Sequence, residues 1–319
     1  MAIVQSSVSR WWNRGAIALV LVLLVIMMIP LYWIGSTAFK ARAESTTVPP
    51  TVFFTPEITP FIKLFTSRVQ QRGASDPDAY AKAPWWEKQV MDGGDRFIRD
   101  GQGRIESSGY VSRFINSIVI AVTSTFLAVA MGTITAYGFS RFKMPGEDDW
   151  LFFILSTRML PPVVVAIPMF LMYRAVGLVD THVGLIILYT AFNLSFSVWL
   201  MKGFIDEIPK EYEEAALVDG YTRLEAFFKI VLPQATTGIA ATAVFCFITA
   251  WNEYAFALMM TNKNAQTAPP YIPSQLGSGL TDWTVIAAGS LLFLIPVALF
   301  TFFLRDHLLR GVTFGAIRR

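Results

Sequence analysis

The sequence predicts an all-α polytopic membrane protein with six transmembrane helices and a long external loop after the first of them. Of the 319 residues, 54% are hydrophobic and only 15% are charged, whereas soluble domains average about 25% charged residues. Six segments reach the roughly 20 mostly apolar residues that a helix needs to cross a bilayer. Barrel strands would be about ten residues long and alternate in polarity, so helices are the expected spanning elements.

The six expected spans follow one another along the chain and differ in their polar content. The first, Gly15 to Phe39, is uncharged and too long for a signal-peptide core, so we expect a retained anchor. The third is interrupted by Arg158 and by the pair Pro161-Pro162, and the fifth carries Glu253. The five spans after the first are expected at about 114–140, 150–173, 183–201, 236–260 and 283–304.

Basic residues in the short connecting segments fall on one side of this arrangement. They are Arg10, Arg14, Arg141, Lys143, Lys202, Lys210, Arg223, Lys229, Arg305, Arg310, Arg318 and Arg319. Because basic short loops stay in the cytoplasm, both termini are expected there, within segment 1–39 at one end and as a tail at 305–319. Residues 40–112 then form a periplasmic loop or small subdomain, since long loops cross largely regardless of charge.

The chain offers few groups for chemistry of its own. The single cysteine, Cys246, lies in an apolar run and is expected to be buried, and no disulfide can form within the chain. His182 and His307 lack ligand-like spacing, so no metal site is expected. Phosphate-binding, zinc-protease and nucleophile–base motifs are absent, so the chain is not expected to be an enzyme. The net charge of +3 does not indicate nucleic acid binding.

The segment expected between the fourth and fifth spans, residues 205–233, has the local pattern of two helices. Pro209 followed by acidic residues indicates a helix start, and Gly220 can end that helix in a left-handed conformation. Thr222 and Glu225 are spaced as a capping box that starts the second helix. One apolar stripe at helical spacing is expected to pack on the bundle, made of Leu224, Phe227, Phe228 and Val231.

The acidic residues of the first helix in this segment are expected to have no partner within the chain. The acids are Asp206, Glu207, Glu211, Glu213, Glu214 and Asp219, against the single lysine Lys210. They form either an ordinary solvated face or a rigid surface offered to a basic or polar cytoplasmic partner. The alanines that follow the acids would allow another backbone to approach closely.

The same segment also carries an extended motif. The pattern EAA, three residues, G, nine residues, I, one residue, LP occupies Glu214-Ala215-Ala216, Gly220, Ile230 and Leu232-Pro233. It resembles the EAA signature of the permease subunits of binding-protein-dependent ABC importers. FINSIVIA (114–121), AWNEYAFAL (250–258) and the C-terminal LLRGVTFGAIRR resemble the carbohydrate-uptake branch, specifically its MalG-like subunit. The resemblance does not cover most of residues 66–110.

The resemblance implies the type I ABC importer permease fold, with its core at residues 113–304. It also implies that the protein lies in the bacterial inner membrane, in contact with membrane lipid. It implies a second permease subunit, favoured as a different chain, two ABC ATPase subunits that bind ATP and Mg, and a periplasmic solute-binding protein. The chain itself would hold no cofactor. A sugar, polyol or glycoside would be the solute. The coupling residues on the ATPase side would be Glu213, Glu214, Ala215, Ala216, Asp219, Gly220, Ile230, Leu232 and Pro233.

Polar groups inside expected spans are costly and mark a solute path or a partner. Arg158, beside the proline break, either lines the path or pairs with Glu253 or with a neighbouring subunit. Asn252 and Glu253 suit sugar hydroxyls and equally suit hydrogen bonds between helices. Asn193 and Ser195 in the fourth span are further path candidates.

An ion-coupled secondary transporter for a small polar solute is the alternative function. It would need sites for coupling ions but no cytoplasmic ATPase, and the EAA pattern argues against it. ATP-dependent uptake that is insensitive to an uncoupler would separate the two hypotheses.

Overall fold

A computed structural model of the chain describes residues 7–70, 76–92, 96–274 and 282–314. Two compact units can be distinguished, one made of residues 1–108 and 275–292 and the other of residues 109–274 and 293–319. Helices dominate the described part of both units, so the predicted helical class is confirmed. The second unit contains the residues that the sequence singled out for function.

The first unit consists of one long helix followed by short elements. They are α1 (Ser7–Thr37), the 3₁₀ turn η1 (Glu44–Thr46), α2 (Thr59–Phe65), β1 (Thr66–Gln70), α3 (Ala79–Lys82), α4 (Trp85–Asp92), α5 (Arg96–Arg99) and β2 (Gly103–Ser107). Strands β1 and β2 pair antiparallel, with Thr66 opposite Ser107 and Gln70 opposite Gly103. This two-stranded sheet departs from a purely helical chain. It shows that residues 40–112 contain secondary structure of their own, while their placement outside the membrane stays a prediction.

The second unit is a helical bundle to which the coupling segment belongs. Its elements are α6 (Tyr110–Arg141), α7 (Glu147–Ser156), η2 (Thr157–Met159), α8 (Pro162–Ala175), α9 (His182–Asp206), α10 (Glu211–Val218), α11 (Arg223–Ala226), the π-helical turn η3 (Phe227–Val231), α12 (Leu232–Gln234), α13 (Thr236–Trp251), α14 (Ala255–Met260) and α15 (Ala268–Ser274). Helix α16 (Trp283–Phe314) contributes to both units.

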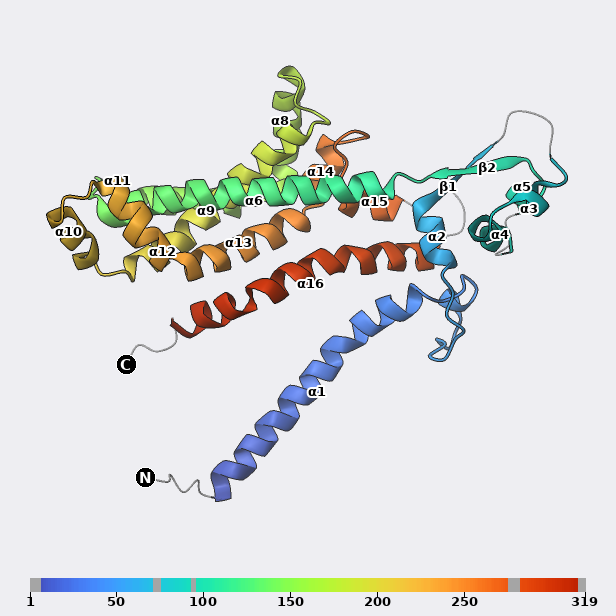
Figure 1. The fold of residues 1–319 in the computed structure, drawn as a ribbon, viewed down its shortest axis with the longest axis horizontal. Coiled ribbons are helices and arrows are strands. Elements are labelled where there is room, and N and C mark those ends of the chain that lie inside the picture. The colour runs from blue at the N-terminus through green and yellow to red at the C-terminus, as the bar shows by residue number, and fades with distance from the viewer. Residues whose placement is uncertain (1–6, 71–75, 93–95, 275–281, 315–319) are drawn as a thin grey trace. The chain divides into compact units, whose positions relative to one another are not determined.

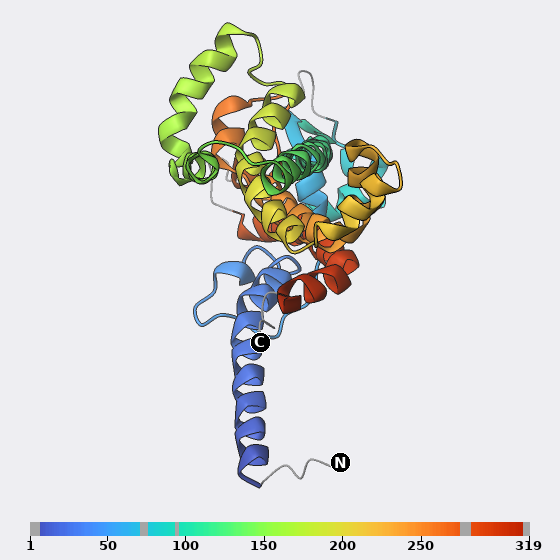
Figure 2. The same ribbon diagram turned by 90° about the vertical axis from the view of Figure 1, so that its left-hand side faces the viewer.

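Helices α6, α9 and α13 pack side by side and form the centre of the second unit (Figures 1 and 2). The buried face of α6 is made mostly of small residues, which let helix backbones approach closely; among them are Ala121, Ser124, Ala128, Gly132 and Ala136. Trp251 of α13 is almost fully buried, stacks on Phe293 at 4.7 Å between ring centroids, and donates its indole N–H to the Phe293 carbonyl at 3.1 Å.

Four described helices are each long and apolar enough to span a membrane. Two pairs of consecutive helices are bent at a short break, and if each pair counts as one span, the described residues contain up to six. The four are Arg14–Thr37, Tyr110–Arg141, His182–Asp206 and Trp283–Arg305. The bent pairs are 147–159 with 162–175, at 92°, and 223–234 with 236–251, at 73°. The segment expected as the third span is therefore not one continuous helix, and the second bend lies just before the segment expected as the fifth span.

The helices in two expected spans and at the start of the expected tail have bounds that differ from the expected ones. The third, expected at 150–173, turns through 92° at Pro161-Pro162 because neither proline can donate a backbone hydrogen bond. The fifth, expected at 236–260, ends at Trp251, and α14 restarts at Ala255 because the Glu253 carboxylate accepts the first N–H groups of the new helix. Helix α16 continues to Phe314 where a tail from 305 was expected, and residues 315–319 lie outside the described residues.

Candidate functional site

Helix α10 ends in the left-handed turn that its sequence predicts. Gly220 has a φ of +92°, a conformation that costs a residue with a Cβ about 1–2 kcal/mol. The N–H of Tyr221 donates to the Ala216 carbonyl at 3.0 Å and the N–H of Gly220 to the Leu217 carbonyl at 3.1 Å. This pair of bonds is the Schellman motif, which satisfies the last carbonyls of a helix and redirects the chain.

The second predicted helix begins as expected and then changes its hydrogen bonding. Thr222 and Glu225 form the reciprocal capping box. After the four residues of α11 the helix widens into the π-helical turn η3, so Phe227 and Val231 share the buried face. Leu224 and Phe228 are 70% and 57% exposed. The predicted four-residue apolar stripe is therefore wrong in half of its members, because a π turn adds about one residue per turn and shifts the helix face.

The predicted coupling residues divide between two faces of the segment. Glu214, Ala215, Asp219 and Gly220 are exposed. Glu213 and Ala216 are buried at 7% and 5% exposure against the chain's own bundle. The expectation that nothing in the chain buries the acids of this helix is wrong for Glu213. Of the downstream positions, Ile230 and Leu232 are half-buried and Pro233 is exposed.

Glu213 is held by two residues of α6 that the sequence did not single out for this role. The Arg141 Nε donates to Glu213 Oε1, and the Tyr137 hydroxyl donates to Glu213 Oε2 at 2.9 Å. The Arg141 Nη2 also donates to the Ile205 and Ile208 carbonyls, at 3.2 and 2.9 Å, where α9 ends. Both charged side chains are nearly buried, at 4% exposure for Arg141 and 9% for Glu213. The ends of α6 and α9 and the start of α10 therefore meet at one guanidinium.

An apolar contact holds the rest of the segment. Phe227 and Val231 pack in a cluster with Ala136 of α6 and with Met201 and Ile205 of α9. The ring of Phe227 lies 4.7 Å from that of Tyr137 between centroids. Figure 1 shows the outcome, with α10, α11 and α12 gathered at the C-terminal end of α6. The segment is attached to the bundle through a polar contact at α10 and an apolar contact at η3.

The predicted solute-path residues fall into two groups along α9. Arg158, in η2, donates from Nη2 to Asn193 Oδ1 at 3.4 Å, and its guanidinium lies 5.2 Å from the Phe196 ring centroid. Asn193 in turn donates to the Cys246 carbonyl at 3.2 Å. The hydroxyl of Ser195 lies 3.2 Å from that of Thr157. Arg158, Asn193 and Ser195 thus form one contact region between η2, α9 and α13.

Glu253 belongs to a separate contact. It accepts a hydrogen bond from the Tyr189 hydroxyl at 2.8 Å and from the backbone N–H of Phe256 and of Ala257 at 2.9 and 3.0 Å. The expected alternative of an ion pair between Arg158 and Glu253 is not found among the described residues. Asn252 donates its side-chain amide back to the Ile248 carbonyl at 2.8 Å. These contacts make the carboxylate a helix cap and a link between helices, as in the alternative of hydrogen bonds between helices.

Comparisons with known proteins identify the family of this chain. Residues 128–314 match the model of the family described as binding-protein-dependent transport system inner membrane component. The chain belongs to this family. A probable ABC transporter permease protein, y4oR, of Sinorhizobium fredii is 28% identical over 93% of this chain and 92% of its own length. The trehalose transport system permease protein SugB of Mycobacterium tuberculosis is 36% identical over 66% of this chain and 77% of its own.

The fold is also that of a solved transporter. A crystal structure of a bacterial ABC transporter involved in the import of the acidic polysaccharide alginate contains a chain that matches 95% of this chain and 99% of its own, with a TM-score of 0.65 and 21% identity. This likeness supports the predicted type I ABC importer permease fold, which is confirmed. Among the described residues of the permease, no group of three or more potential metal ligands occurs.

Near the N-terminal end of α6, far from the coupling segment, the carboxylate of Asp180 holds another connection of the permease. This contact, the Asp180 clamp, was not found by the sequence analysis. Asp180 has a φ of +57°, and its carboxylate accepts the backbone N–H groups of Asn262, Lys263, Asn264 and Ala265 at 3.0–3.2 Å. Partial burial acts to raise the pKa of the Asp180 carboxyl, but these donors together outweigh it and lower that pKa. An aspartate in a VDTH turn carries no sequence pattern that would reveal a partner 82–85 positions away.

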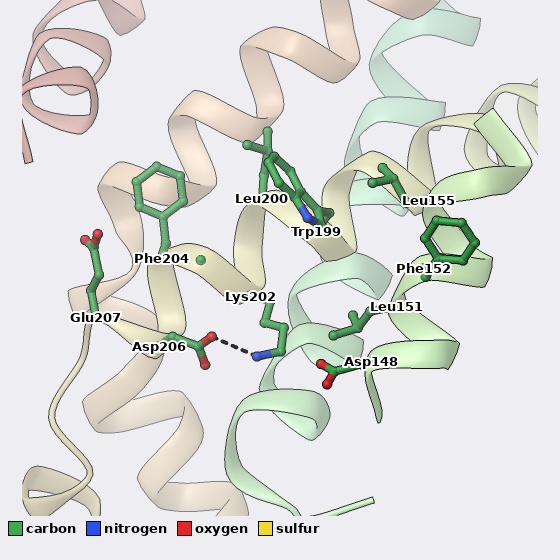
Figure 3. A pocket seen from close by; sticks show the side chains of 11 residues that line it. Asp148, Leu151, Phe152, Leu155, Trp199, Leu200, Lys202, Phe204, Asp206 and Glu207 are labelled. Atoms are coloured by element: carbon green, nitrogen blue, oxygen red, sulfur yellow. Dashed lines mark hydrogen bonds and ion pairs between the residues drawn. The ribbon is translucent and has the colours of Figure 1, made fainter. Parts of the chain in front are cut away.

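A groove of about 780 Å³ lies between α7 and the end of α9 (Figure 3). Its apolar wall includes Leu151, Phe152 and Phe204, and its charged end includes Lys202. The ammonium of Lys202 lies 2.8 Å from Asp206 and 3.3 Å from Glu147. None of the five predicted solute-path residues lines this groove. It is therefore distinct from the Arg158 region.

Proposed function

We propose that this chain is a transmembrane subunit of an ATP-driven importer that moves a sugar, polyol or glycoside from a periplasmic binding protein into the cytoplasm. Membership of the inner membrane component family supports the importer class. The trehalose permease and the alginate importer to which the chain is similar support a carbohydrate as the solute. Two partner ATPase subunits would bind ATP and Mg and hydrolyse the nucleotide, and a second permease subunit, favoured as a different chain, would complete the path.

The observation that carries the coupling part of the proposal is the exposed face of α10. Glu214, Ala215, Asp219 and Gly220 point away from the bundle, whereas the opposite face of the helix is attached to α6 and α9. Val218 beside them is 87% exposed, so a carboxylate and a small apolar surface are presented together. A helix that packs on the bundle with one face and is exposed on the other can be bound and displaced by a partner subunit.

The location of this face follows from the predicted orientation. If both termini are cytoplasmic, α10 lies in the cytoplasm, where ATPase subunits work, and the Asp180 clamp lies at the periplasmic surface. Solute would then pass between the subunits near the Arg158 region, where a half-buried guanidinium has no carboxylate partner among the described residues. A guanidinium beside an amide and an aromatic ring can bind solute hydroxyls.

The coupling proposal is tested by charge reversal on the exposed face. The importer is reconstituted in proteoliposomes with its binding protein and ATPase subunits, and Glu214→Arg is compared with Glu207→Arg, an exposed acid outside α10. We expect Glu214→Arg to lower ATP-dependent uptake at least tenfold and to weaken co-purification of the ATPase subunits, with membrane insertion intact. Glu207→Arg should behave as the parent. Normal uptake and assembly in Glu214→Arg would overturn the coupling role.

The transport class and the solute are tested in the same vesicles. Uptake that requires ATP and persists with an uncoupler supports the importer. Uptake that an uncoupler abolishes, without ATP, would instead establish the ion-coupled secondary transporter. The thermal shift of the binding protein against a panel of sugars, polyols and glycosides identifies the solute, and a response only to other compound classes would reject the carbohydrate assignment.

A further inference from the structure

We propose that Arg141, Tyr137 and Glu213 form an internal lock that makes α10 move as one body with the ends of α6 and α9. The inference rests on the proposed coupling function of α10. It removes Glu213 from the surface that meets the ATPase and makes it a positioning residue inside the permease. The acid that meets the partner is then Glu214 alone within the EEAA sequence.

The lock joins three helices through one side chain. Arg141 is the last residue of α6. Its Nη2 donates to the carbonyl of Ile205, in the last turn of α9, and to that of Ile208, two residues beyond the end of α9. Its Nε donates to Glu213 in the first turn of α10. Tyr137, one turn before Arg141 on the same face of α6, donates to the other carboxylate oxygen at 2.9 Å. Both oxygens of Glu213 are therefore engaged by α6.

Burial distinguishes this contact from an ordinary surface ion pair. Exposed pairs contribute little to rigidity because water competes for both partners, but Arg141 and Glu213 are only 4% and 9% exposed. Within the described residues, Glu213 is the one carboxylate within ion-pair distance of Arg141, and the Arg141 Nη1 is buried without a partner. Losing the Glu213 carboxylate would thus leave a buried, uncompensated guanidinium, which is strongly unfavourable.

The position of α10 in the chain explains why it needs such an anchor. The helix has only eight residues, follows the Pro209 turn and ends at the left-handed Gly220. The apolar contact of Phe227 and Val231 lies beyond Gly220, outside α10 itself. Inside the helix, only Glu213 and Ala216 are buried, and an alanine provides a small contact without direction. The directed hydrogen bonds of Glu213 therefore hold the orientation of the exposed face.

The consequence concerns how a push on α10 reaches the bundle. With the lock intact, displacement of the exposed face moves the ends of α6 and α9 with it. Without the lock, α10 can turn on its two flanking hinges while ATPase subunits remain bound to Glu214 and Ala215. ATP would then be hydrolysed without a matching movement of the transmembrane helices, so hydrolysis and uptake would separate.

The test uses the complete importer in proteoliposomes and compares Glu213→Gln with Glu211→Gln, an exposed acid of the same helix turn. The readouts are solute imported per ATP hydrolysed and retention of the ATPase subunits on purification. We expect Glu213→Gln to keep the ATPase subunits and their hydrolysis but to import at least fivefold less solute per ATP. Glu211→Gln should stay within twofold of the parent. Tyr137→Phe, which removes one hydrogen bond and keeps the ring contact, should give an intermediate loss.

A second measurement does not depend on transport. Spin labels are placed at Ile134 of α6 and Val218 of α10, which are 60% and 87% exposed, in a background where the buried Cys246 is alanine. The distance distribution should be narrow in the parent and clearly broader in Glu213→Gln and Tyr137→Phe. Glu211→Gln should leave it narrow.

The outcomes separate the lock from the coupling function. Unchanged distances together with unchanged uptake per ATP in Glu213→Gln would overturn the lock. Loss of the ATPase subunits with unchanged distances would also overturn it and would make Glu213 a direct ATPase contact. If the parent complex shows no ATP-driven uptake, the proposed function fails, and the distance measurement still decides whether α10 is fastened to α6.

Discussion

Replacing Asp180 by asparagine tests how strongly one carboxylate holds the two connections of the bundle at the N-terminal end of α6. In the parent, Oδ1 accepts from Asn262, Lys263, Asn264 and Ala265, and Oδ2 accepts again from Lys263 and Asn264. Asparagine keeps one acceptor oxygen and the tolerance for the left-handed backbone. Its NH₂ group, however, would face N–H donors, and the negative charge would be lost.

The size of the effect follows from those contacts. A hydrogen bond to a charged group contributes about 1.5–3 kcal/mol, and a neutral one about 1 kcal/mol. The affected N–H groups keep a second acceptor at Oδ1, with distances of 3.2 Å for Lys263 and 3.1 Å for Asn264. We therefore expect Asp180→Asn to lower the free energy of unfolding by about 1–3 kcal/mol. For a unit of this size, each kcal/mol lowers Tm by about 2–4 °C.

The assay is thermal unfolding of the purified permease in detergent, with Asp78→Asn as the control. Asp78 is exposed, and its side chain accepts no hydrogen bond that caps α3, so the same chemical change should leave Tm unaltered there. Asp180→Ala, which also loses the left-handed preference, should unfold at a lower temperature than Asp180→Asn. Equal Tm values for the parent and both Asp180 variants would refute the clamp.

The clamp also predicts a pH dependence. Asp180 lies between α8 and α9, outside the spanning helices, and its pKa is lower in the folded chain than the ordinary value of 3.8. A lowered pKa contributes stability at pH values above the unfolded value and loses it as the pH falls through the folded value. The difference in Tm between the parent and Asp180→Asn should hold at about pH 6 and shrink at about pH 3. A difference that grows on acidification would contradict the assignment.

Two further substitutions test the bundle and the solute path. In Gly132→Ala, the added methyl would lie 2.2 Å from Ser197 Oγ and 3.1 Å from the Ser197 carbonyl carbon, so we expect a loss of about 1–3 kcal/mol of unfolding free energy. Gly138→Ala on the same helix meets nothing within 4 Å, and equal Tm values for the two variants would refute the close contact. Arg158→Ala should lower uptake in proteoliposomes at least tenfold with assembly intact, because the guanidinium faces the proposed path. Loss of the companion permease on purification would instead assign Arg158 to the subunit interface.

The local sequence determined those features that depend on neighbouring residues. Apolar runs predict the membrane helices, because burying some 20 apolar residues in lipid needs no knowledge of the rest of the chain. The left-handed end of α10 at Gly220 and the capping box of Thr222 and Glu225 are likewise contained in a few adjacent residues, and both are present. The third span was expected to be interrupted at Pro161-Pro162, but the 92° between its halves could not be inferred.

Only the tertiary structure decided which of two adjacent glutamates is exposed. Successive residues on a helix point about 100° apart, so Glu213 and Glu214 must differ, but nothing within EEAA says which one faces the bundle. The answer depends on Arg141 and Tyr137, which lie 72 and 76 positions earlier in the chain. The same holds for Asp180, whose partners come from a connection more than 80 residues away. Local patterns specify helices and turns, whereas pairing between distant polar groups is set by how the helices pack.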